Sequence, residues 1–138
     1  MADPLHVEVV SADRVVWSGE ASQVVTRTTE GDIGILPRHQ PMLALLVPNA
    51  VEIFATDGTR EVIAVDGGFV SVDHNRVSIL SEFASSGEIS LERAERELAE
   101  AGKLLDDGDQ SEETRKQFLR ASAQVKAARK LNGGNSGV

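Results

Sequence analysis

The residues most able to do chemistry in this chain are its three histidines and the polar groups beside them. His6, His39 and His74 lie far apart and lack the spacing that is typical of metal ligands. The chain has no cysteine, no Gly-x-Ser-x-Gly motif and no clustered pair of histidine and carboxylate. A single histidine in a loop is too little for a metal site or a catalytic base. The sequence therefore predicts binding rather than catalysis, with no metal ion.

The stretch most suited to binding is residues 31–41, Gly-Asp-Ile-Gly-Ile-Leu-Pro-Arg-His-Gln-Pro. Its glycines can adopt backbone angles forbidden to other residues, and its two prolines tend to end or interrupt a strand. The pattern predicts a short edge strand that leads into a rigid, exposed loop. The tip of this loop presents Arg38, His39 and Gln40. An ordinary sheet corner would explain the same residues, so both interpretations stay open.

The elements that position this loop are predicted to be strands. Residues 1–85 are rich in Val, Ile, Thr and Gly, and their apolar residues alternate with polar ones over short runs. Asp57-Gly58 marks a hairpin between two such runs, and His74-Asn75 marks a turn between the next two. Many short strands joined by tight turns predict an antiparallel β-sandwich or flattened barrel.

The composition changes at Ser85-Ser86-Gly87, after which Ala, Glu, Leu, Lys and Arg dominate. Apolar residues then recur at helical spacing in two stripes, separated by the helix breaker at residues 106–109. The first stripe is Leu91, Ala94, Leu98, Ala101 and Leu105, and the second is Phe118, Ala121, Val125 and Ala128. The predicted fold class is α+β, with a β-sandwich domain at residues 1–85, an antiparallel two-helix hairpin at 88–131 and a disordered tail at 132–138.

The predicted hairpin is unevenly charged. Residues 86–110 carry three basic and eight acidic side chains, whereas residues 111–138 carry six basic and two acidic ones. The alanine-rich stripes bury little surface, so the hairpin should be marginally held and able to detach, although permanent docking is the alternative. The basic second helix could attract the acidic first helix or an acidic surface of a partner.

The overall composition limits the partners. A net charge of −8 argues against nucleic acid. No apolar run approaches the roughly 20 residues that a membrane-spanning helix needs. We therefore expect a soluble chain that reaches a membrane only through a protein partner.

Residues 31–41 closely resemble the signature Gly-(acidic)-Ile-Gly-Ile-Leu-Pro-x-His-x-Pro of the epsilon subunits of F-type ATP synthases, in their bacterial form. The similarity extends over residues 4 to 131 in the family's order of elements. Its other matching blocks are Leu5–Ser11, Trp17–Gly19, Val65–Val72 and Asn75–Leu80. The resemblance implies a non-catalytic rotor subunit of the central stalk, which couples rotation of the proton-driven c-subunit ring to ATP synthesis. A β-sandwich adaptor with a helical tail, unrelated to a rotary ATPase, is the alternative.

The resemblance also implies partners and site residues. The sandwich would bind the gamma subunit and touch the ring through Asp32, Arg38, His39, Gln40 and Met42. The helices would extend into the head of alpha and beta subunits and inhibit ATP hydrolysis. The basic residues expected to act there are Arg115, Arg120, Lys126, Arg129 and Lys130. The implied location is the cytoplasmic side of the cell membrane, as a peripheral subunit.

Some members of this family bind ATP through the motif Ile/Leu-Asp-x-x-Arg-Ala. This chain has Ile-Ser-Leu-Glu-Arg-Ala at residues 89–94, so a serine replaces the aspartate. Serine carries no charge, and we expect no cofactor except weakly bound regulatory ATP. Its candidate ligands are Ile89, Arg93, Arg120 and Arg129, with Arg115 as a further arginine. The alternative is that Arg93 is simply a solvated helix residue.

Overall fold

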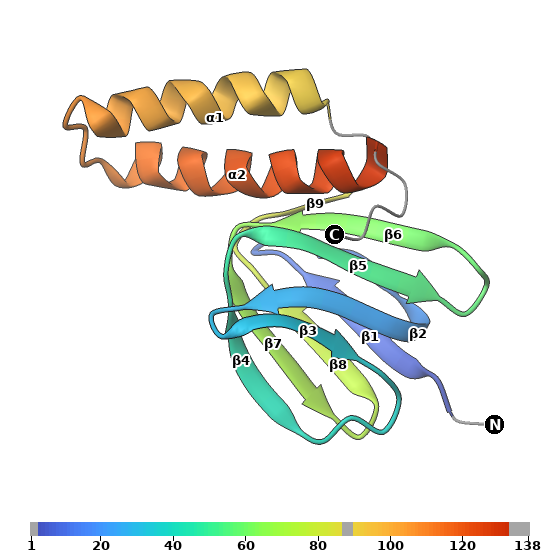
Figure 1. Ribbon diagram of the computed structural model, residues 1–138. Coiled ribbons are helices and arrows are strands. Elements are labelled where there is room, and N and C mark those ends of the chain that lie inside the picture. Colours follow the sequence, from blue (N-terminus) through green and yellow to red (C-terminus); the bar gives the residue numbers. More distant parts are fainter. Residues whose placement is uncertain (1–2, 87–89, 133–138) are drawn as a thin grey trace.

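The structure of the chain is a computed structural model, and it describes residues 3–86 and 90–132. A strand-rich body carries a helical hairpin on one end (Figure 1). The strands are β1 Leu5–Val10, β2 Val15–Thr28, β3 Gly31–Ile35, β4 Met42–Leu46, β5 Asn49–Ala55, β6 Arg60–Val65, β7 Gly68–Asp73, β8 Arg76–Leu80 and β9 Ala84–Ser86. The helices are α1 Leu91–Asp106 and α2 Glu112–Asn132. The predicted tail beyond Asn132 lies outside the described residues, as does Ile89.

The strands form one continuous sheet that folds over on itself. Its order is β1-β8-β7-β4-β2-β5-β6-β9, and β3 pairs only with β2, so β3 is an edge strand. The long strand β2 pairs with β1 through its first half and with β3 and β5 through its second half. A register shift between Ala21 and Gln23 lies where the strand passes from one layer to the other. The predicted β-sandwich or flattened barrel is confirmed, with one parallel pair, β1 with β8.

Alternation of apolar and polar residues builds the core between the two layers. In β1 the side chains of Leu5, Val7 and Val9 are buried, while His6 and Glu8 are exposed. The same period of two places one face of each strand inward, because successive side chains in a strand point to opposite sides. The core is aliphatic, and Leu, Ile and Val supply all of its largest fully buried side chains.

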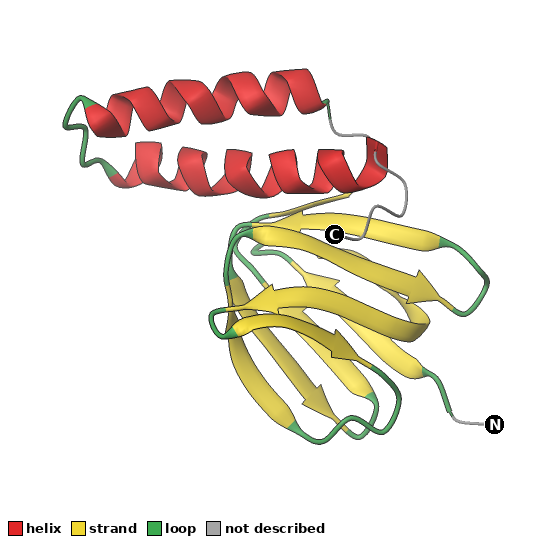
Figure 2. Cartoon of the chain, viewed as in Figure 1, coloured by secondary structure: helices red, strands yellow, loops and turns green. Residues whose placement is uncertain are grey.

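The two helices pair as an antiparallel hairpin and lie across the end of the sheet that contains β5 and β6 (Figure 2). The hydroxyl of Ser90 caps α1 by accepting from the Arg93 amide at 3.2 Å. The hydroxyl of Ser111 caps α2 by accepting from the Thr114 amide at 3.2 Å. The predicted hairpin is therefore present, with the break between the helices at the predicted place.

One feature of α2 differs from the single apolar stripe that the sequence predicts. Ala123 and Ala127 are also fully buried, and they pack against the outer face of β5 and β6. Their contacts there are Ala50, Val62 and Ala64. Helix α2 therefore packs on two sides, against α1 and against the sandwich. Strand β5 is consequently buried on both faces, which the alternating pattern of its sequence does not predict.

Candidate functional site

The loop between β3 and β4 is largely exposed, and hydrogen bonds within it support its backbone. The His39 amide donates to the Leu36 carbonyl at 3.1 Å, and Nδ1 of His39 lies 2.8 Å from the Gln40 carbonyl. Arg38 has a positive φ of 72°. Arg38, His39 and Gln40 therefore lie together at the end of the molecule opposite the helices (Figure 1).

The two other residues expected in this contact lie elsewhere. Asp32 sits near the far end of β3, pairs with Arg27 at 3.2 Å and faces the cavity beside α2. Met42 is half-buried against the core of the sandwich. The structure thus brings three of the five residues together and does not bring Asp32 to the loop.

The turn His74-Asn75 contacts the loop, which the sequence pattern does not predict. The Arg38 amide donates to Oδ1 of Asn75 at 2.7 Å. Side chains from both segments line one cavity of about 400 Å³. The sequence marks each segment as a turn, but only the register of the intervening strands brings positions 37 residues apart into contact.

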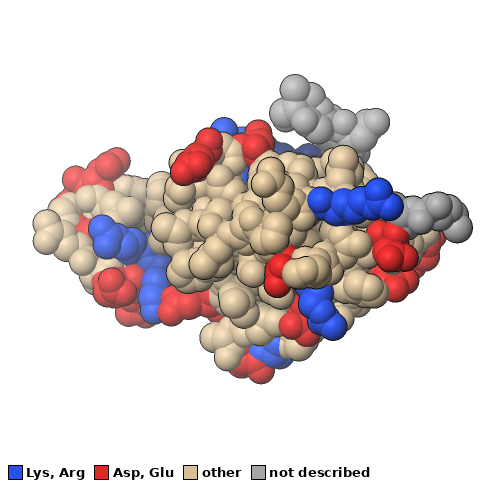
Figure 3. Space-filling view, turned by 90° about the horizontal axis from the view of Figure 1, so that it is seen from below, with Lys and Arg blue, Asp and Glu red and all other residues tan. Residues whose placement is uncertain are grey.

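An apolar face covers the outer side of β4, β7 and β8. Leu45 pairs with Phe69, and Phe69 pairs with Leu80, so the three side chains form a row across the strands. Leu43 lies two residues from Leu45 on the same face and is 72% exposed. Seen from below, a wide uncharged surface occupies the middle of the molecule (Figure 3). Clustered exposed large hydrophobic residues of this kind mark an interaction surface.

The basic residues of α2 turn mainly toward the sandwich. Arg120 pairs with Asp66 at 3.3 Å, and its guanidinium lies 5.2 Å from the centre of the Phe83 ring. Lys130 pairs with Glu52 at 2.9 Å, and Lys126 donates to the Pro48 carbonyl at 2.8 Å. The remaining pairs are Lys116 with Glu82 on the sandwich and Arg129 with Glu95 on α1.

Arg115 differs from the other basic residues of this helix. It is exposed, and its side chain has no ion pair among residues 3–86 and 90–132. The expected attraction between the two helices therefore reduces to one ion pair, Arg129 with Glu95, within the described chain. Most of the positive charge of α2 is directed at carboxylates and carbonyls of the sandwich instead.

Two nearly buried carboxylates form ion pairs with α2, and the sequence pattern does not predict either of them. The side chains of Glu52 and Asp66 are each 8% exposed. Oε2 of Glu52 accepts from Arg60 at 2.6 Å, while Oε1 faces Lys130. Oδ1 of Asp66 accepts from Ser81 and from the Phe83 amide, while Oδ2 faces Arg120. Each carboxylate is therefore held within the sandwich by one oxygen and offers the other to α2.

The sequence around each of these two carboxylates has an unusual feature. Glu52 is an isolated acidic residue in the otherwise apolar run of residues 50–55, and Asp66 directly precedes Gly67-Gly68. Such positions are normally assigned to the solvent face of a strand or to a turn. Only the presence of α2 over the outer face turns them into docking groups.

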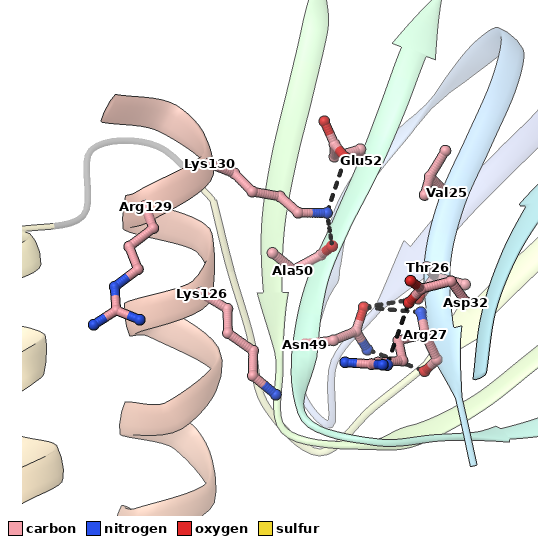
Figure 4. Close-up of a pocket in the computed structure, with 10 residues that line it drawn as sticks. All are labelled: Val25, Thr26, Arg27, Asp32, Asn49, Ala50, Glu52, Lys126, Arg129 and Lys130. Atoms are coloured by element: carbon pink, nitrogen blue, oxygen red, sulfur yellow. Dashed lines mark hydrogen bonds and ion pairs between the residues drawn. The ribbon is translucent and has the colours of Figure 1, made fainter. Parts of the chain in front are cut away.

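A cavity of about 320 Å³ lies between α2 and the sandwich (Figure 4). It is lined by basic side chains from β2 and α2 and by two carboxylates, namely Arg27, Lys126, Arg129, Lys130, Asp32 and Glu52. Burial lowers the pKa of Lys126, and the nearby charge of Arg27 lowers this pKa further. Burial raises the pKa of Glu52, but hydrogen bonds from Lys130 and Arg60 outweigh it and the pKa is lowered below 4.5.

The residues expected to bind nucleotide are not gathered at one place. Arg93 pairs with Glu97 one turn further along α1 at 3.0 Å. Arg120 lies nine residues before Arg129 on α2, about 13 Å along the helix axis. Each of these arginines already has a carboxylate partner. Ile89 lies outside the described residues.

Residues 3–86 and 90–132 contain no group of three or more His, Cys, Asp or Glu that could hold a metal ion. No helix within these ranges is both long and apolar enough to cross a membrane.

Comparison with known proteins identifies the family. The model of the ATP synthase delta/epsilon chain β-sandwich domain matches residues 4–87. The ATP synthase epsilon chain of Cutibacterium acnes is 48% identical over 136 residues, which cover 91% of this chain and 92% of that protein. The ATP synthase epsilon chain of Streptomyces coelicolor is 50% identical over 125 residues, covering 89% of this chain and 98% of that protein.

A solved structure confirms that both parts of the fold recur together. A chain in the Euglena gracilis mitochondrial ATP synthase, solved with its OSCP, F1 and c-ring, superposes with a TM-score of 0.72. The alignment covers 96% of this chain and 82% of that one, at 20% identity. This likeness supports the fold, and the relatives of about 50% identity decide the family. The chain belongs to the family of ATP synthase delta and epsilon chains.

Proposed function

We propose that this chain is a non-catalytic subunit of the central stalk of an F-type ATP synthase and works as its epsilon chain. The observation that carries the proposal is family membership along nearly the whole length of the relatives, including the helical part. As such a subunit it associates with the membrane-bound complex. We place it on the cytoplasmic side of the cell membrane, attached through its partners.

The apolar face of β4, β7 and β8 is our candidate for docking the gamma subunit. Its four large side chains are Leu43, Leu45, Phe69 and Leu80. A stalk subunit that must turn with gamma needs a firm, non-sliding contact, and burial of several large apolar side chains supplies most of such binding energy. The side chains stand on strands that are hydrogen-bonded to one another, so little conformational entropy of the backbone is lost on binding.

The ring of c subunits is the second proposed partner. The loop that joins β3 to β4 lies at the end of the sandwich away from the helices (Figure 1). This arrangement lets the chain contact gamma through its side and the ring through its end. Rotation of the ring would then be passed to gamma through a stiff β-sandwich.

The helical hairpin is the proposed regulatory part. In the docked form, Arg120, Lys126 and Lys130 are occupied by the sandwich. In an extended form the same side chains and Arg115 would be available to acidic surfaces of the alpha and beta subunits, where they inhibit ATP hydrolysis. Docking and inhibition would then compete for one set of basic groups.

Regulatory ATP is a further proposed ligand. Its candidate ligands Arg93, Arg120 and Arg129 are separated and already paired in the docked form. Binding of ATP would have to exchange these carboxylates for phosphate oxygens. We therefore expect no tight site, and isothermal titration of the full chain with ATP measures this directly.

The experiment that tests the proposed function measures capture of the full chain by a complex of alpha, beta and gamma subunits from the same organism. We expect the chain to bind only when gamma is present. Phe69→Ser should weaken binding at least about tenfold, because it removes a large side chain from the centre of the apolar face. Leu104→Ser is the matched control, since Leu104 is an exposed leucine of α1. Failure of the unaltered chain to bind gamma would overturn its proposed place in the central stalk.

A further inference from the structure

The cavity between α2 and the sandwich carries an excess of positive charge, although the whole chain has a net charge of −8 (Figure 4). We call it the hairpin cavity. Four cationic side chains line it, and only two carboxylates do so. A local excess of cations on an acidic protein indicates a place where an anion can bind.

Two of the four cations already have carboxylate partners. Lys130 pairs with Glu52 at 2.9 Å. Arg129 pairs with Glu95 at 3.3 Å, and Figure 4 shows its guanidinium group pointing away from β5. These two side chains are therefore neutralised by the chain itself and need no external anion.

Lys126 and Arg27 are the cations that remain. The ammonium group of Lys126 donates to the Pro48 carbonyl at 2.8 Å and has no ion pair in the part of the chain that the structure describes. Asp32 meets Arg27 through Nε at 3.2 Å, and no hydrogen bond between described residues occupies the terminal guanidinium nitrogens. Figure 4 shows the two charged groups directed toward each other. Burial lowers the pKa of Lys126 and the charge of Arg27 lowers it further, so like charges face each other across this cavity.

The buried side chain of Asn49 supports both sides of the cavity. Its Oδ1 accepts from the Arg27 amide at 3.2 Å and from the Thr26 hydroxyl at 3.0 Å. Its Nδ2 donates to the Val47 carbonyl at 2.6 Å and to the Arg27 carbonyl at 3.4 Å. Val47 directly precedes Pro48, whose carbonyl receives the ammonium group from α2. One amide thus fixes the backbone at both cations, so their positions are organised before a ligand arrives.

We propose that the hairpin cavity binds inorganic phosphate between Lys126 of α2 and Arg27 of β2, and that the bound anion holds the helical hairpin against the sandwich. The terminal nitrogens of a guanidinium group match two phosphate oxygens, and an ammonium group can take a third. The described lining includes no aromatic side chain that could stack on a nucleotide base, so it favours a compact anion. This proposal does not depend on the proposed function, because the site lies within one chain.

Binding and docking are linked in this site. The phosphate contacts come from both α2 and the sandwich, so the complete site exists only in the docked form. A ligand that binds only one of two forms shifts the balance toward that form by a factor of one plus its concentration divided by its Kd. Phosphate also relieves the repulsion between Lys126 and Arg27, which otherwise opposes docking.

The test uses the full chain alone, with inorganic phosphate as the probe and sodium chloride adjusted to keep the ionic strength constant. Calorimetric titration gives the Kd, and hydrogen exchange followed by mass spectrometry reports docking of α2. At a concentration about ten times its Kd, phosphate should slow exchange through undocking about tenfold. Lys126→Gln and Arg27→Gln should each weaken phosphate binding at least about tenfold.

Arg27→Gln separates loss of the ligand from loss of packing. Within the described residues Arg27 makes no hydrogen bond or ion pair to α2, so this variant should keep α2 at least as protected in the absence of phosphate and should lose the response to phosphate. Arg96→Gln is the matched control, because it removes the same charge from an exposed position of α1. It should retain both the affinity and the response.

Unchanged phosphate affinity in Arg27→Gln would overturn the proposal. Equal protection of α2 in phosphate and in chloride at one ionic strength would overturn it as well. ATP carries the same phosphate oxygens and is titrated in parallel. Protection by ATP without protection by inorganic phosphate would also contradict the proposal, because the ligand would then need contacts beyond its phosphate group.

Discussion

The ammonium group of Lys130 lies 2.9 Å from Oε1 of Glu52, so the last turn of α2 is held by a carboxylate in the middle of β5. The opposite oxygen of Glu52 accepts from Arg60 at 2.6 Å. Because Arg60 belongs to the sandwich, Glu52 keeps one cationic partner when α2 leaves. When the helix leaves, the Glu52 carboxylate is therefore not left buried without a cationic partner, which would cost free energy. This arrangement favours a hairpin that can dock and undock reversibly.

Replacing Lys130 tests the strength of this contact. Lys130→Met retains an apolar stem but removes the ammonium group, and we expect docking of α2 to weaken by about 1–3 kcal/mol. Hydrogen exchange followed by mass spectrometry should show faster exchange in α2 and unchanged exchange in β1, β7 and β8. Lys103→Met, at an exposed position of α1, is the control and should change neither. Equal protection of α2 in both variants would mean that the ion pair contributes nothing to docking.

The pH dependence of stability should report the same carboxylate. Hydrogen bonds from Lys130 and Arg60 outweigh the effect of burial and hold the pKa of Glu52 below its ordinary value of 4.5. The unfolded chain therefore binds the proton more readily, so the stabilisation is fully present above about pH 4.5 and is lost as the pH falls through the lower folded pKa. Urea unfolding between about pH 6 and pH 3 measures it.

Glu52→Gln is the comparison for the pH experiment. The variant cannot ionise at this position, so the difference in unfolding free energy between it and the unaltered chain should shrink as the pH falls. Other carboxylates titrate in both proteins and cancel in the difference. A difference that stays constant down to pH 3 would show that Glu52 does not carry this dependence.

The sandwich, its turns and the hairpin could be predicted because local signals determine them. Alternation in β1, the Asp57-Gly58 turn and the serine caps at Ser90 and Ser111 all act within a few residues. The docking of α2 could not be predicted in the same way. Ala123 and Ala127 are equally suited to an exposed helical surface, and only the presence of β5 and β6 makes them core residues.

The candidate site, like the fold, could be predicted only where local sequence signals determine it. Arg38, His39 and Gln40 lie in the loop that glycine and proline mark. Asn75, however, reaches the Arg38 amide only because β3, β4, β7 and β8 bring their ends together. Glu52 looks like a solvent-facing residue by period alone, yet it is buried by a helix that begins 60 residues later. Contacts between distant segments depend on register, which short-range patterns do not specify.

Gly68 tests the packing of the sandwich itself. It has a φ of 106°, and a Cβ there would collide with the Leu80 carbonyl oxygen. We expect Gly68→Ala to lower the free energy of unfolding by about 3 kcal/mol or more, because backbone strain and the collision act together. Gly58 has a φ of 93° but open space around it, so Gly58→Ala should cost only about 1 kcal/mol. Similar losses from both variants would show that the approach to Leu80 is not limiting.

Asp66 offers a way to loosen the hairpin without changing α2. Asp66→Asn keeps an oxygen for Ser81 and the Phe83 amide but removes the charge that faces Arg120. We expect docking to weaken by about 1 kcal/mol, which shifts the balance toward the extended form about fivefold. If the extended helices inhibit hydrolysis, this variant should inhibit the reconstituted alpha, beta and gamma complex more strongly than the unaltered chain, at equal binding to gamma.

Comparison of Asp66→Asn with Arg120→Ala separates the two proposed roles of Arg120, which are docking of α2 to the sandwich and inhibition of ATP hydrolysis. Arg120→Ala also weakens docking, but it removes a basic group from the helix that would meet the head, so its inhibition should fall short of that of Asp66→Asn. Stronger inhibition by Asp66→Asn than by Arg120→Ala would mean that docking and inhibition draw on one set of side chains. Equal inhibition by both variants and the unaltered chain would mean that release of α2 does not govern hydrolysis. ATPase rates measured at saturating amounts of each variant distinguish these results.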